Sequence, residues 1–349
     1  MTNVTLIGID TAKNIFHLYA VDRNGKKIYQ RECRRPKFLS FLAQQSPCVV
    51  ALEACSATHY WARKINALGH EVRLINARRV HQFTSRNKND FNDARAVTKA
   101  ARDPDTYFVA QKSVEQQAMQ AVHIMRDAII KQQTATVNSV RALLTEFGIV
   151  LPKGKANLKK HIPSILEDAE NELPSTVREI IAEQYEKLNQ LANEIKRYNQ
   201  RVEHCLKHSE SAKRLKQIPG MGPLISTALS YMIAEPKLFK NGRNCAASLG
   251  LTPKEHSTGG NQRLGKISRE GNSYLRKIIV QGAQAVLQHA HKKQDPLSRW
   301  AYKLQETKGK NVAAIALANK MVRIAWAMLV HQSDYHYKPQ HFNETTAII

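Results

Sequence analysis

Two apolar runs near the start of the chain each end in a single acidic residue. Leu6-Ile7-Gly8-Ile9 leads into Asp10, and Cys48-Val49-Val50-Ala51-Leu52 leads into Glu53. Short apolar runs of this kind are typical of buried strands. A carboxylate at the end of a buried strand is costly to desolvate unless another group compensates its charge. The pattern therefore predicts core strands that present acids at their ends.

A second pair of acids opens a predicted helix. Asp90 and Asp93 are three residues apart, which places them on one helix face. Together with Asp10 and Glu53 they would supply four oxygen donors, the ligand type that Mg²⁺ prefers. Each acid has a structural alternative, as a strand-end or helix-start residue or as a first-turn acid that complements the helix dipole. Because the pattern occurs on two strands, we favour the metal site.

The order of predicted elements gives a fold class for the first 108 residues. Strands are expected at 4–9, 17–21, 27–33, 48–52 and 70–75, and helices at 37–44, 59–68 and 90–102. Three successive strands followed by helix–strand units, with acids on the first and fourth strands and on a late helix, are typical of a ribonuclease H-like α/β fold. A fold of this kind does not by itself define a function.

The rest of the chain is predicted to be helical. Apolar residues recur at helical spacing over 113–147 and 175–208, with a short helix at 162–173 between them. This pattern indicates an antiparallel coiled-coil stalk, with a plain helical bundle as the alternative. A last apolar helix at 312–330 would close the core of the C-terminal region, and residues 333–349 form a polar tail.

The charge of the chain points to a polyanionic partner. Its 349 residues carry a formal net charge of +24, which favours nucleic acid. No apolar run approaches the roughly 20 residues needed to span a bilayer, and no signal-peptide pattern is found. The five cysteines include no Cys-x-x-Cys pair, so no zinc site or disulfide framework is supported. We expect a cytoplasmic protein without a membrane partner.

Basic and glycine-rich segments are the candidate nucleic-acid contacts. Pro219-Gly220-Met221-Gly222 resembles the turn of a helix-hairpin-helix element, although a plain interhelical turn has the same composition. Between Lys207 and Lys277 the chain has 13 Lys or Arg against four Glu and no Asp, an excess of nine positive charges. The predicted nucleic-acid-binding residues are Arg78, Arg79, Arg86, Lys88, Gly220, Gly222, Thr258, Arg263, Lys266, Arg269 and Arg276.

Ser257 lies in a loop-like segment, 250–272, that is rich in Gly, Ser, Thr and basic residues. A serine among cations could attack a phosphodiester, because the cations would hold the phosphate and favour the alkoxide. The alternative is a phosphate-binding loop whose serine only donates a hydrogen bond. The residues alone leave both possibilities open.

Five ordered motifs together resemble one family. They are Gly8-Ile9-Asp10, Leu52-Glu53-Ala54, Lys88-x-Asp90-x-x-Asp93-Ala94, Ile218-Pro219-Gly220-x-Gly222, and Gly250-Leu251-x-Pro253 with His256-Ser257-Thr258-Gly259-Gly260. They resemble the DEDD-type transposases of insertion-sequence family one-hundred-and-ten, and the last motif resembles its eleven-eleven subgroup. The resemblance runs from Ile7 to about Trp326.

The resemblance implies an architecture and a mechanism. It implies a RuvC-like domain at 1–108 with Asp10, Glu53, Asp90 and Asp93 as metal ligands, a helical linker at 109–210 and a serine transposase domain at 211–332. It implies cutting and rejoining of donor and target DNA through a phosphoserine intermediate, at a composite site between subunits of a dimer that assembles to a tetramer. It further implies a structured guide RNA, so that base pairing reads the sequence. A bacterial, nucleoid-associated cytoplasmic location follows.

The nucleophile falls on one of two neighbouring residues. Spacing from Gly250-Leu251 places the family's serine slot at Thr258, one residue after Ser257. A primary alcohol is less hindered than a β-branched one, so we predict Ser257, with Thr258 as the alternative. Two other functions compete with the recombinase: a metal-dependent junction resolvase that activates water and forms no covalent intermediate, and a non-catalytic nucleic-acid-binding protein.

Overall fold

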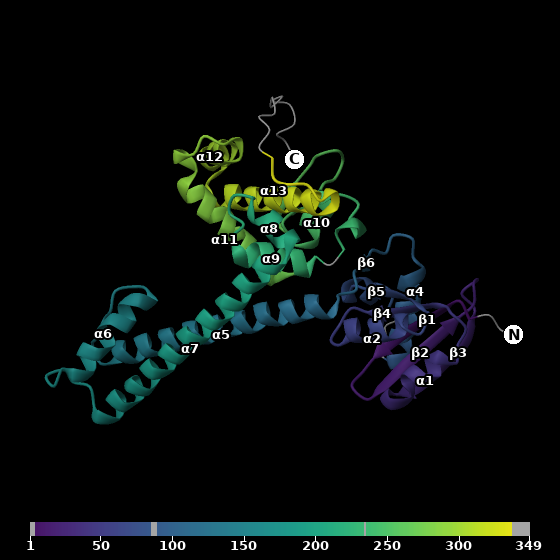
Figure 1. Cartoon of the computed structure of the whole chain (residues 1–349), viewed down its shortest axis with the longest axis horizontal. Helices are drawn as coiled ribbons and strands as arrows, with labels where there is room; N and C mark the ends of the chain where they lie inside the picture. The colour runs from purple at the N-terminus through teal and green to yellow at the C-terminus, as the bar shows by residue number, and fades with distance from the viewer. Residues whose placement is uncertain (1–3, 85–88, 234, 337–349) are drawn as a thin grey trace. The chain divides into compact units, whose positions relative to one another are not determined.

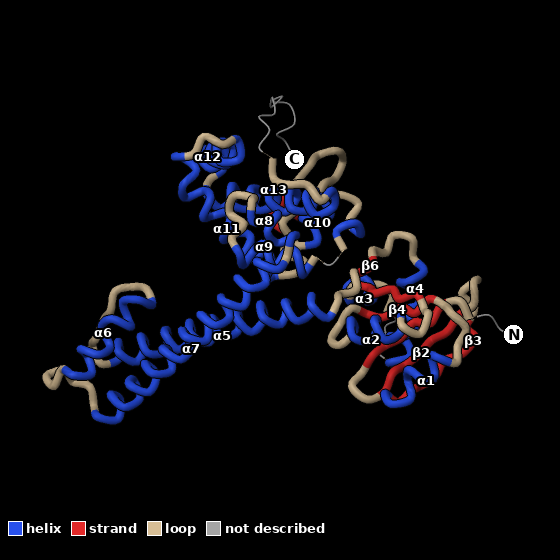
Figure 2. Tube along the Cα trace, viewed as in Figure 1, coloured by secondary structure: helices blue, strands red, loops and turns tan. Residues whose placement is uncertain are grey.

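The computed structural model describes residues 4–84, 89–233 and 235–336, and the chain divides into two compact units. One unit comprises Met1–Glu115 with Ile233–Lys240, and the other comprises Gln116–Met232 with Asn241–Ile349. The strands of the first unit form one sheet, whereas the second unit is dominated by helices (Figures 1 and 2). Within the second, Asp334 accepts hydrogen bonds from Arg214 and Gln217, and the rest of the predicted tail, 337–349, lies outside the described residues.

The described residues of the first unit before α5 form six strands and four α-helices. Its elements are β1 (Leu6–Thr11), β2 (Ile15–Val21), β3 (Lys27–Arg34), α1 (Phe38–Ala43), β4 (Val49–Glu53), α2 (Thr58–Asn66), β5 (Glu71–Ile75), α3 (Ala77–His81), α4 (Asp90–Arg102) and β6 (Phe108–Val109). The sheet order is β3-β2-β1-β4-β5-β6. Strands β1, β4 and β5 run parallel, and the other pairs are antiparallel. This topology is compatible with the predicted ribonuclease H-like fold.

Helices cover both faces of the sheet because the core strands are apolar on both sides. Ile7 and Ile9 of β1 pack on one face with Phe38 of α1 and Trp61 of α2. Leu6 packs on the opposite face, in a cluster that includes side chains of α3 and α4. Alternation along the strand therefore directs residues 6, 8 and 10 of β1 toward the side of α4.

Helix α3 was not predicted from the sequence, which gave no element at 77–81. Residues 77–81 form helix α3, because the side chain of Asn76 accepts a hydrogen bond from the backbone N–H of Arg78 and caps the helix. Arg86 and Lys88 lie outside the described residues. Strand β6 was not predicted either, because its two residues are too few to leave a periodic pattern.

The second unit is built mainly from helices. Its elements are α5 (Val114–Glu146, which starts in the first unit), α6 (Lys155–Glu167), α7 (Ser175–His208), α8 (Glu210–Lys216), α9 (Pro223–Met232), α10 (Gly242–Ser248), β7 (Pro253–Glu255), β8 (Leu264–Ile267), α11 (Ser273–His289), α12 (Pro296–Lys308) and α13 (Lys310–His331).

Helices α5 and α7 lie side by side in antiparallel orientation (Figure 1). Arg126, early in α5, donates to Asn199, late in α7, at 2.7 Å. At the other end Leu144 of α5 and Ile181 of α7 share an apolar cluster with α6. The supercoil of a coiled coil stays a prediction.

Helix α6 was predicted seven residues too late in the chain. It begins after Gly154, whose φ of 108° favours glycine, and it tolerates Pro163 in its interior. It ends at Glu167, where the guanidinium of Arg178 donates to the carbonyls of Ile165 and Leu166. A side chain from α7 thus satisfies the end of α6, and this contact has no local sequence signal.

Helix α13 is long and apolar enough to cross a membrane by length and composition. It packs along its length against α8, α10, α11 and α12. Leu317 and Met321 of α13 are fully buried. The core helix of a folded domain passes the same test of length and composition, and this packing explains why α13 is apolar.

Candidate metal centre and serine hairpin

Asp10 and Glu53 are neighbours on one face of the sheet. Ile9 of β1 pairs with Leu52 of the parallel strand β4, so the next residue of each strand is an acid. Ile9 and Leu52 belong to the core on the α1 and α2 side. Because side chains alternate along a strand, Asp10 and Glu53 face the side of α4.

A close approach of α4 to β1 brings two more acids to this place. A Cβ atom on Gly8 would lie 2.1 Å from Thr98 Oγ1 and 2.6 Å from the Ala94 carbonyl oxygen, so a larger residue would push the helix away. Asn89 caps α4 by accepting a hydrogen bond from the N–H of Phe91. Asp90 and Asp93 occupy the first turn of this helix, beside the end of β1.

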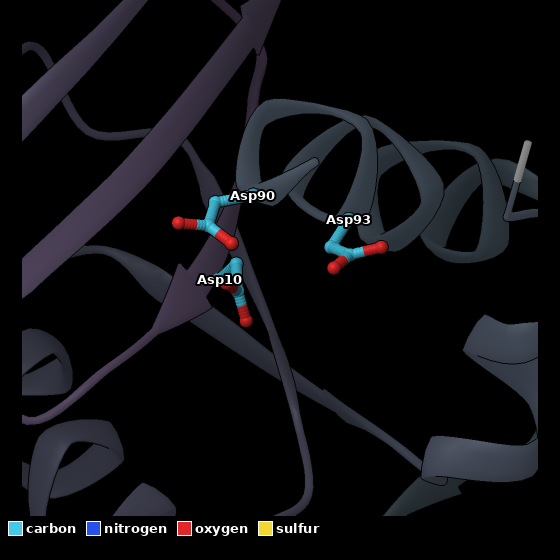
Figure 3. Close-up of side chains that lie close together, drawn as sticks. All are labelled: Asp10, Asp90 and Asp93. Carbon is cyan, nitrogen blue, oxygen red and sulfur yellow. The ribbon is translucent and has the colours of Figure 1, made fainter. Parts of the chain in front are cut away.

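Three of the four predicted carboxylates converge. Asp10, Asp90 and Asp93 each offer an oxygen atom, and these atoms lie within 4.8 Å of one another. Figure 3 shows Asp10 at the end of its strand and the other two on one helical turn. Among the described residues Glu53 is not part of this closest group, although its charge still interacts with Asp10 and Asp93.

Burial and the neighbouring acids raise the pKa values of Asp10 and Glu53. Burial, and then the charges of Asp93 and Asp90, raise the pKa of Asp10 above its usual range. Burial, and then the charges of Asp10 and Asp93, raise the pKa of Glu53. Asp10 and Glu53 are therefore harder to ionise because the neighbouring acids are present. A bound cation would relieve this repulsion.

The donor set fits a hard divalent cation. Carboxylate oxygens from a strand end and a helix start can share one ion without large movement, and such oxygens are the ligands of Mg²⁺ and similar ions. Asp10 and Asp93 are half-buried and Asp90 is exposed, so a phosphate can reach the site from solvent.

His17 is a neighbour of the acids that the sequence analysis missed. It pairs with Asp10 in the β1–β2 register, is 7% exposed, and its Nδ1 lies 3.6 Å from Asp90 Oδ2. Nδ1 has no hydrogen-bond partner, whereas Nε2 lies 3.4 Å from Glu32 Oε1. The predicted strands contained a signal for this contact. When two successive strands pair antiparallel, the first residue of the second strand lies opposite the end of the first strand.

Ser257 lies on a β-hairpin instead of the loop expected from the sequence. Strands β7 and β8 pair antiparallel, with Glu255 opposite Leu264. Gly259 and Gly260 both have positive φ, 58° and 77°, which two-residue hairpin turns of this type require. Gly259 and Gly260, which contributed to the prediction of a loop, therefore make a tight turn.

The two candidate nucleophiles differ in their contacts. The Ser257 hydroxyl donates to Glu255 Oε1 at 2.6 Å and accepts from the Arg263 backbone N–H at 3.2 Å. Thr258 pairs through its backbone with Asn261, at the turn. Both residues are exposed.

The predicted nucleic-acid-binding cations have different surroundings. Arg263, Lys266 and Arg269 are exposed on or next to the hairpin. Arg276 is half-buried and donates to the carbonyls of Leu249 and Glu270, and burial followed by the charge of Arg269 lowers its pKa. Arg276 therefore ties the base of the hairpin to α11.

The two arginines of α3 also differ. Arg78 is exposed, whereas Arg79 is half-buried. The guanidinium of Arg79 forms an ion pair with Asp103 at 2.6 Å and donates to Thr106 Oγ1 at 3.1 Å. The structure thus gives Arg79 a packing role inside the unit.

Gly220 and Gly222 lie between α8 and α9 and have unequal environments. A Cβ atom on Gly220 would lie 2.7 Å from Val286 Cγ2 and 2.8 Å from the Gly282 carbonyl oxygen of α11. A Cβ atom on Gly222 would meet nothing within 4 Å. Gly220 is therefore needed for helix packing, and a helix-hairpin-helix role in phosphate binding stays a prediction.

Two family models match the chain in the stretches that carry these residues. A DEDD transposase model, described as "Transposase", matches residues 7–149, which include all four acids. A model described as "Transposase IS116/IS110/IS902 family" matches residues 212–298, which include the hairpin.

Named relatives resemble nearly the whole chain. A "Probable family 20 transposase" of Pseudomonas aeruginosa is 38% identical over 95% of this chain and 99% of its own length. The "Transposase for insertion sequence element IS1328" of Yersinia enterocolitica is 37% identical over 94% and 97%. The "Transposase for insertion sequence element IS1111A" of Coxiella burnetii is 34% identical over 96% and 92%. With these relatives and both models in agreement, the chain belongs to the IS110/IS116/IS902 family of transposases.

Proposed function

We propose that this transposase cuts and rejoins DNA through a covalent link to Ser257, with Mg²⁺ held by Asp10, Glu53, Asp90 and Asp93. The observation that carries the proposal is the convergence of Asp10, Asp90 and Asp93 within 4.8 Å at the end of β1. A cluster of like charges in which the pKa of one member, Asp10, is raised is typical of a functional site, and three converging carboxylates favour a bound cation.

The carboxylates and the serine have separate tasks in this proposal. Bound Mg²⁺ would stabilise the negative charge that develops on the phosphate. Asp10 and Glu53, on neighbouring strands, and Asp90 and Asp93, on α4, would hold the ion. Ser257 then attacks the scissile phosphate and keeps the strand attached while the partner strand is exchanged.

The nucleic-acid partners follow from family membership and charge. The family acts on DNA, and the net charge of +24 supports extensive phosphate contact. We propose that Arg263, Lys266 and Arg269 contact the backbone beside the hairpin, and that a structured guide RNA pairs with donor and target DNA. We further propose a dimer that assembles to a tetramer in the bacterial cytoplasm.

A trapping experiment tests the mechanism. Wild-type protein and the variants Ser257→Ala, Thr258→Ala and Asp10→Ala are incubated with Mg²⁺, the element's RNA and labelled junction DNA, and then run on a denaturing gel. We expect a covalent protein–DNA band in wild type that is lost in Ser257→Ala and Asp10→Ala.

Three other outcomes of this experiment would change the proposed function. A band that persists in Ser257→Ala but disappears in Thr258→Ala would move the nucleophile by one residue. Cut DNA without a covalent band in any lane would replace the recombinase by a metal-dependent nuclease of the junction-resolvase kind, since four carboxylates suffice to activate water. DNA binding without any cleavage would indicate a non-catalytic protein.

A further inference from the structure

The Ser257 hydroxyl is hydrogen-bonded to a carboxylate of its own hairpin. Ser257 Oγ lies 2.6 Å from Glu255 Oε1 and donates its proton to that oxygen. The two residues are separated by one position, so they share a face of the hairpin. A short hydrogen bond from a hydroxyl to a carboxylate places the proton on the path it would take in a deprotonation.

A second contact fixes the orientation of the hydroxyl. The backbone N–H of Arg263 donates to Ser257 Oγ at 3.2 Å. Arg263 is held in place because its carbonyl accepts from the His256 N–H at 3.0 Å across the hairpin. A backbone N–H aimed at an oxygen that becomes an alkoxide stabilises the charge that develops there. Ser257 therefore has a proton acceptor on one side and an anion-stabilising donor on the other.

The carboxylate is itself oriented. Gln262 Nε2 donates to Glu255 Oε1 at 3.4 Å from the other arm of the hairpin. Glu255 pairs with Leu264 in the ladder, so its backbone is part of the strand. The base, the nucleophile and the donor thus come from one hairpin that closes through its glycine turn, and they need no other element to meet.

We propose that Glu255 is the general base that activates Ser257, an inference that rests on the proposed function. The Ser257 hydroxyl proton passes to Glu255 Oε1 while the serine Oγ–phosphorus bond forms. The bond from phosphorus to the bridging oxygen of the leaving strand breaks, and that oxygen takes a proton from water. In rejoining, a sugar hydroxyl gives its proton to the hydroxide left by the first step and attacks phosphorus, the serine Oγ–phosphorus bond breaks, and the departing Ser257 oxygen recovers its proton from Glu255.

The same geometry favours Ser257 over Thr258. Adjacent residues of a strand point to opposite faces, so Thr258 faces away from the side shared by Glu255 and Ser257. Thr258 is also engaged through its backbone in the turn, with the Asn261 N–H donating to its carbonyl at 3.1 Å.

The first test measures the reactivity of the serine without DNA or RNA. The full chain is treated with diisopropyl fluorophosphate, in which a serine oxygen displaces fluoride from phosphorus, and the labelled residue is located by mass spectrometry. We expect labelling at Ser257 that falls about a hundredfold in Glu255→Gln and is partly restored in Glu255→Asp. The matched control is Glu210→Gln, because Glu210 is an exposed acid of the same unit that pairs with Lys213. Equal labelling of wild type and Glu255→Gln would overturn the proposal.

The second test follows the covalent DNA adduct as a function of pH. We expect Glu255→Gln to form the adduct about a hundredfold more slowly at neutral pH, with unchanged DNA affinity. Its rate should rise about tenfold per pH unit, because hydroxide would then have to remove the serine proton. An adduct that forms at the same rate in wild type and Glu255→Gln would overturn the role of Glu255 and leave the serine mechanism intact. An adduct that is absent even in wild type, beside normal labelling of Ser257, would reject the proposed function alone.

Discussion

Gly8 and Thr98 set how closely helix α4 approaches strand β1. A Cβ atom added to Gly8 would lie 2.1 Å from Thr98 Oγ1, and Thr98 Oγ1 already donates to the Ala94 carbonyl at 3.0 Å. Since α4 carries Asp90 and Asp93 and β1 carries Asp10, this contact between a strand and a helix decides whether the acids can meet.

Replacing Gly8 should therefore damage stability and the metal site together. We expect Gly8→Ala to lower the free energy of unfolding by about 1–3 kcal/mol, the usual effect of overpacking, and to weaken Mg²⁺ binding. Urea unfolding and calorimetric titration with Mg²⁺ measure the two effects. Gly222→Ala is the stability control, because its added Cβ would meet nothing within 4 Å. Unchanged Mg²⁺ affinity in a folded Gly8→Ala protein would contradict this interpretation.

The metal-free site should destabilise the fold at neutral pH. The pKa of Asp10 is raised by burial and by Asp93 and Asp90, so its ionised form is less favourable in the folded state than in the unfolded state. Its contribution to stability is therefore present at low pH and is lost as pH rises through the folded-state pKa. We expect Asp10→Asn to raise the melting temperature in EDTA at pH 7.

The order of stability should reverse when Mg²⁺ is added. Binding to the folded state stabilises the wild-type protein by about 2.7 kcal/mol at a free Mg²⁺ concentration 100 times Kd, and Asp10→Asn should gain less. A melting curve of each protein with and without Mg²⁺ measures this. A wild-type protein that melts at the same temperature in EDTA and in Mg²⁺ would count against the metal site.

Gly220 and Gly282 should act as a packing pair. A Cβ atom on Gly282 would lie 2.4 Å from the Gly220 carbonyl oxygen and 2.6 Å from Ile225 Cδ1. We expect Gly282→Ala to cost about 1–3 kcal/mol of stability, measured by urea unfolding. Gly222→Ala, by contrast, should keep the stability of the wild-type protein. The affinity of this variant for DNA therefore tests whether the turn binds phosphate. If the Gly282→Ala variant unfolds at the same urea concentration as the wild-type protein, Gly220 and Gly282 are not a packing pair.

His123 should make the second unit sensitive to acid. It is fully buried, and burial followed by the charge of Arg126 lowers its pKa to about 4. Its Nδ1 lies 2.9 Å from the Tyr274 hydroxyl and its Nε2 lies 3.2 Å from Thr227 Oγ1. The Thr227 hydroxyl donates to the Pro223 carbonyl, so it accepts from Nε2, and the neutral ring satisfies the network.

The sign of the pH effect follows from this lowered pKa. Between pH 6.5 and about 4 the unfolded chain binds a proton at His123 that the folded chain does not. Stability is therefore complete above pH 6.5 and falls by about 3 kcal/mol toward pH 4. The free energy of unfolding, measured in urea, should be lower at pH 4.5 than at pH 7. We expect His123→Leu to remove the part of this difference that comes from His123. An unchanged difference would mean that His123 is not the titrating group.

Lys266 should contribute to DNA binding through phosphate contact. We expect Lys266→Ala to reduce the slope of log affinity against log salt concentration by about one, measured by fluorescence anisotropy. Lys187→Ala removes the same charge from an exposed position on α7. Equal reductions in both variants would indicate a general effect of net charge and reject a specific contact at the hairpin.

The sequence by itself determined the local elements and the types of residue that matter. Apolar runs that end in Asp10 and Glu53 predicted β1 and β4, and the i, i+3 spacing of Asp90 and Asp93 predicted the start of α4, because alternation and helical period are properties of short segments. The same reasoning predicted α5 and α7 within a few residues, since long amphipathic helices leave many repeats of their pattern.

Only the tertiary structure decided which groups meet. His17 comes next to Asp90 through the β1–β2 register and the position of α4, and the Arg263 backbone N–H reaches the Ser257 hydroxyl because two glycines with positive φ close a hairpin where a loop was expected. Gly220 was predicted to contact phosphate, which stays a prediction, and it lies against Gly282, 62 residues further along the chain. The contacts of His17 with Asp90 and of Gly220 with Gly282 depend on packing between elements distant in sequence, where local spacing carries no information, and so these neighbours were fixed only when the elements came together.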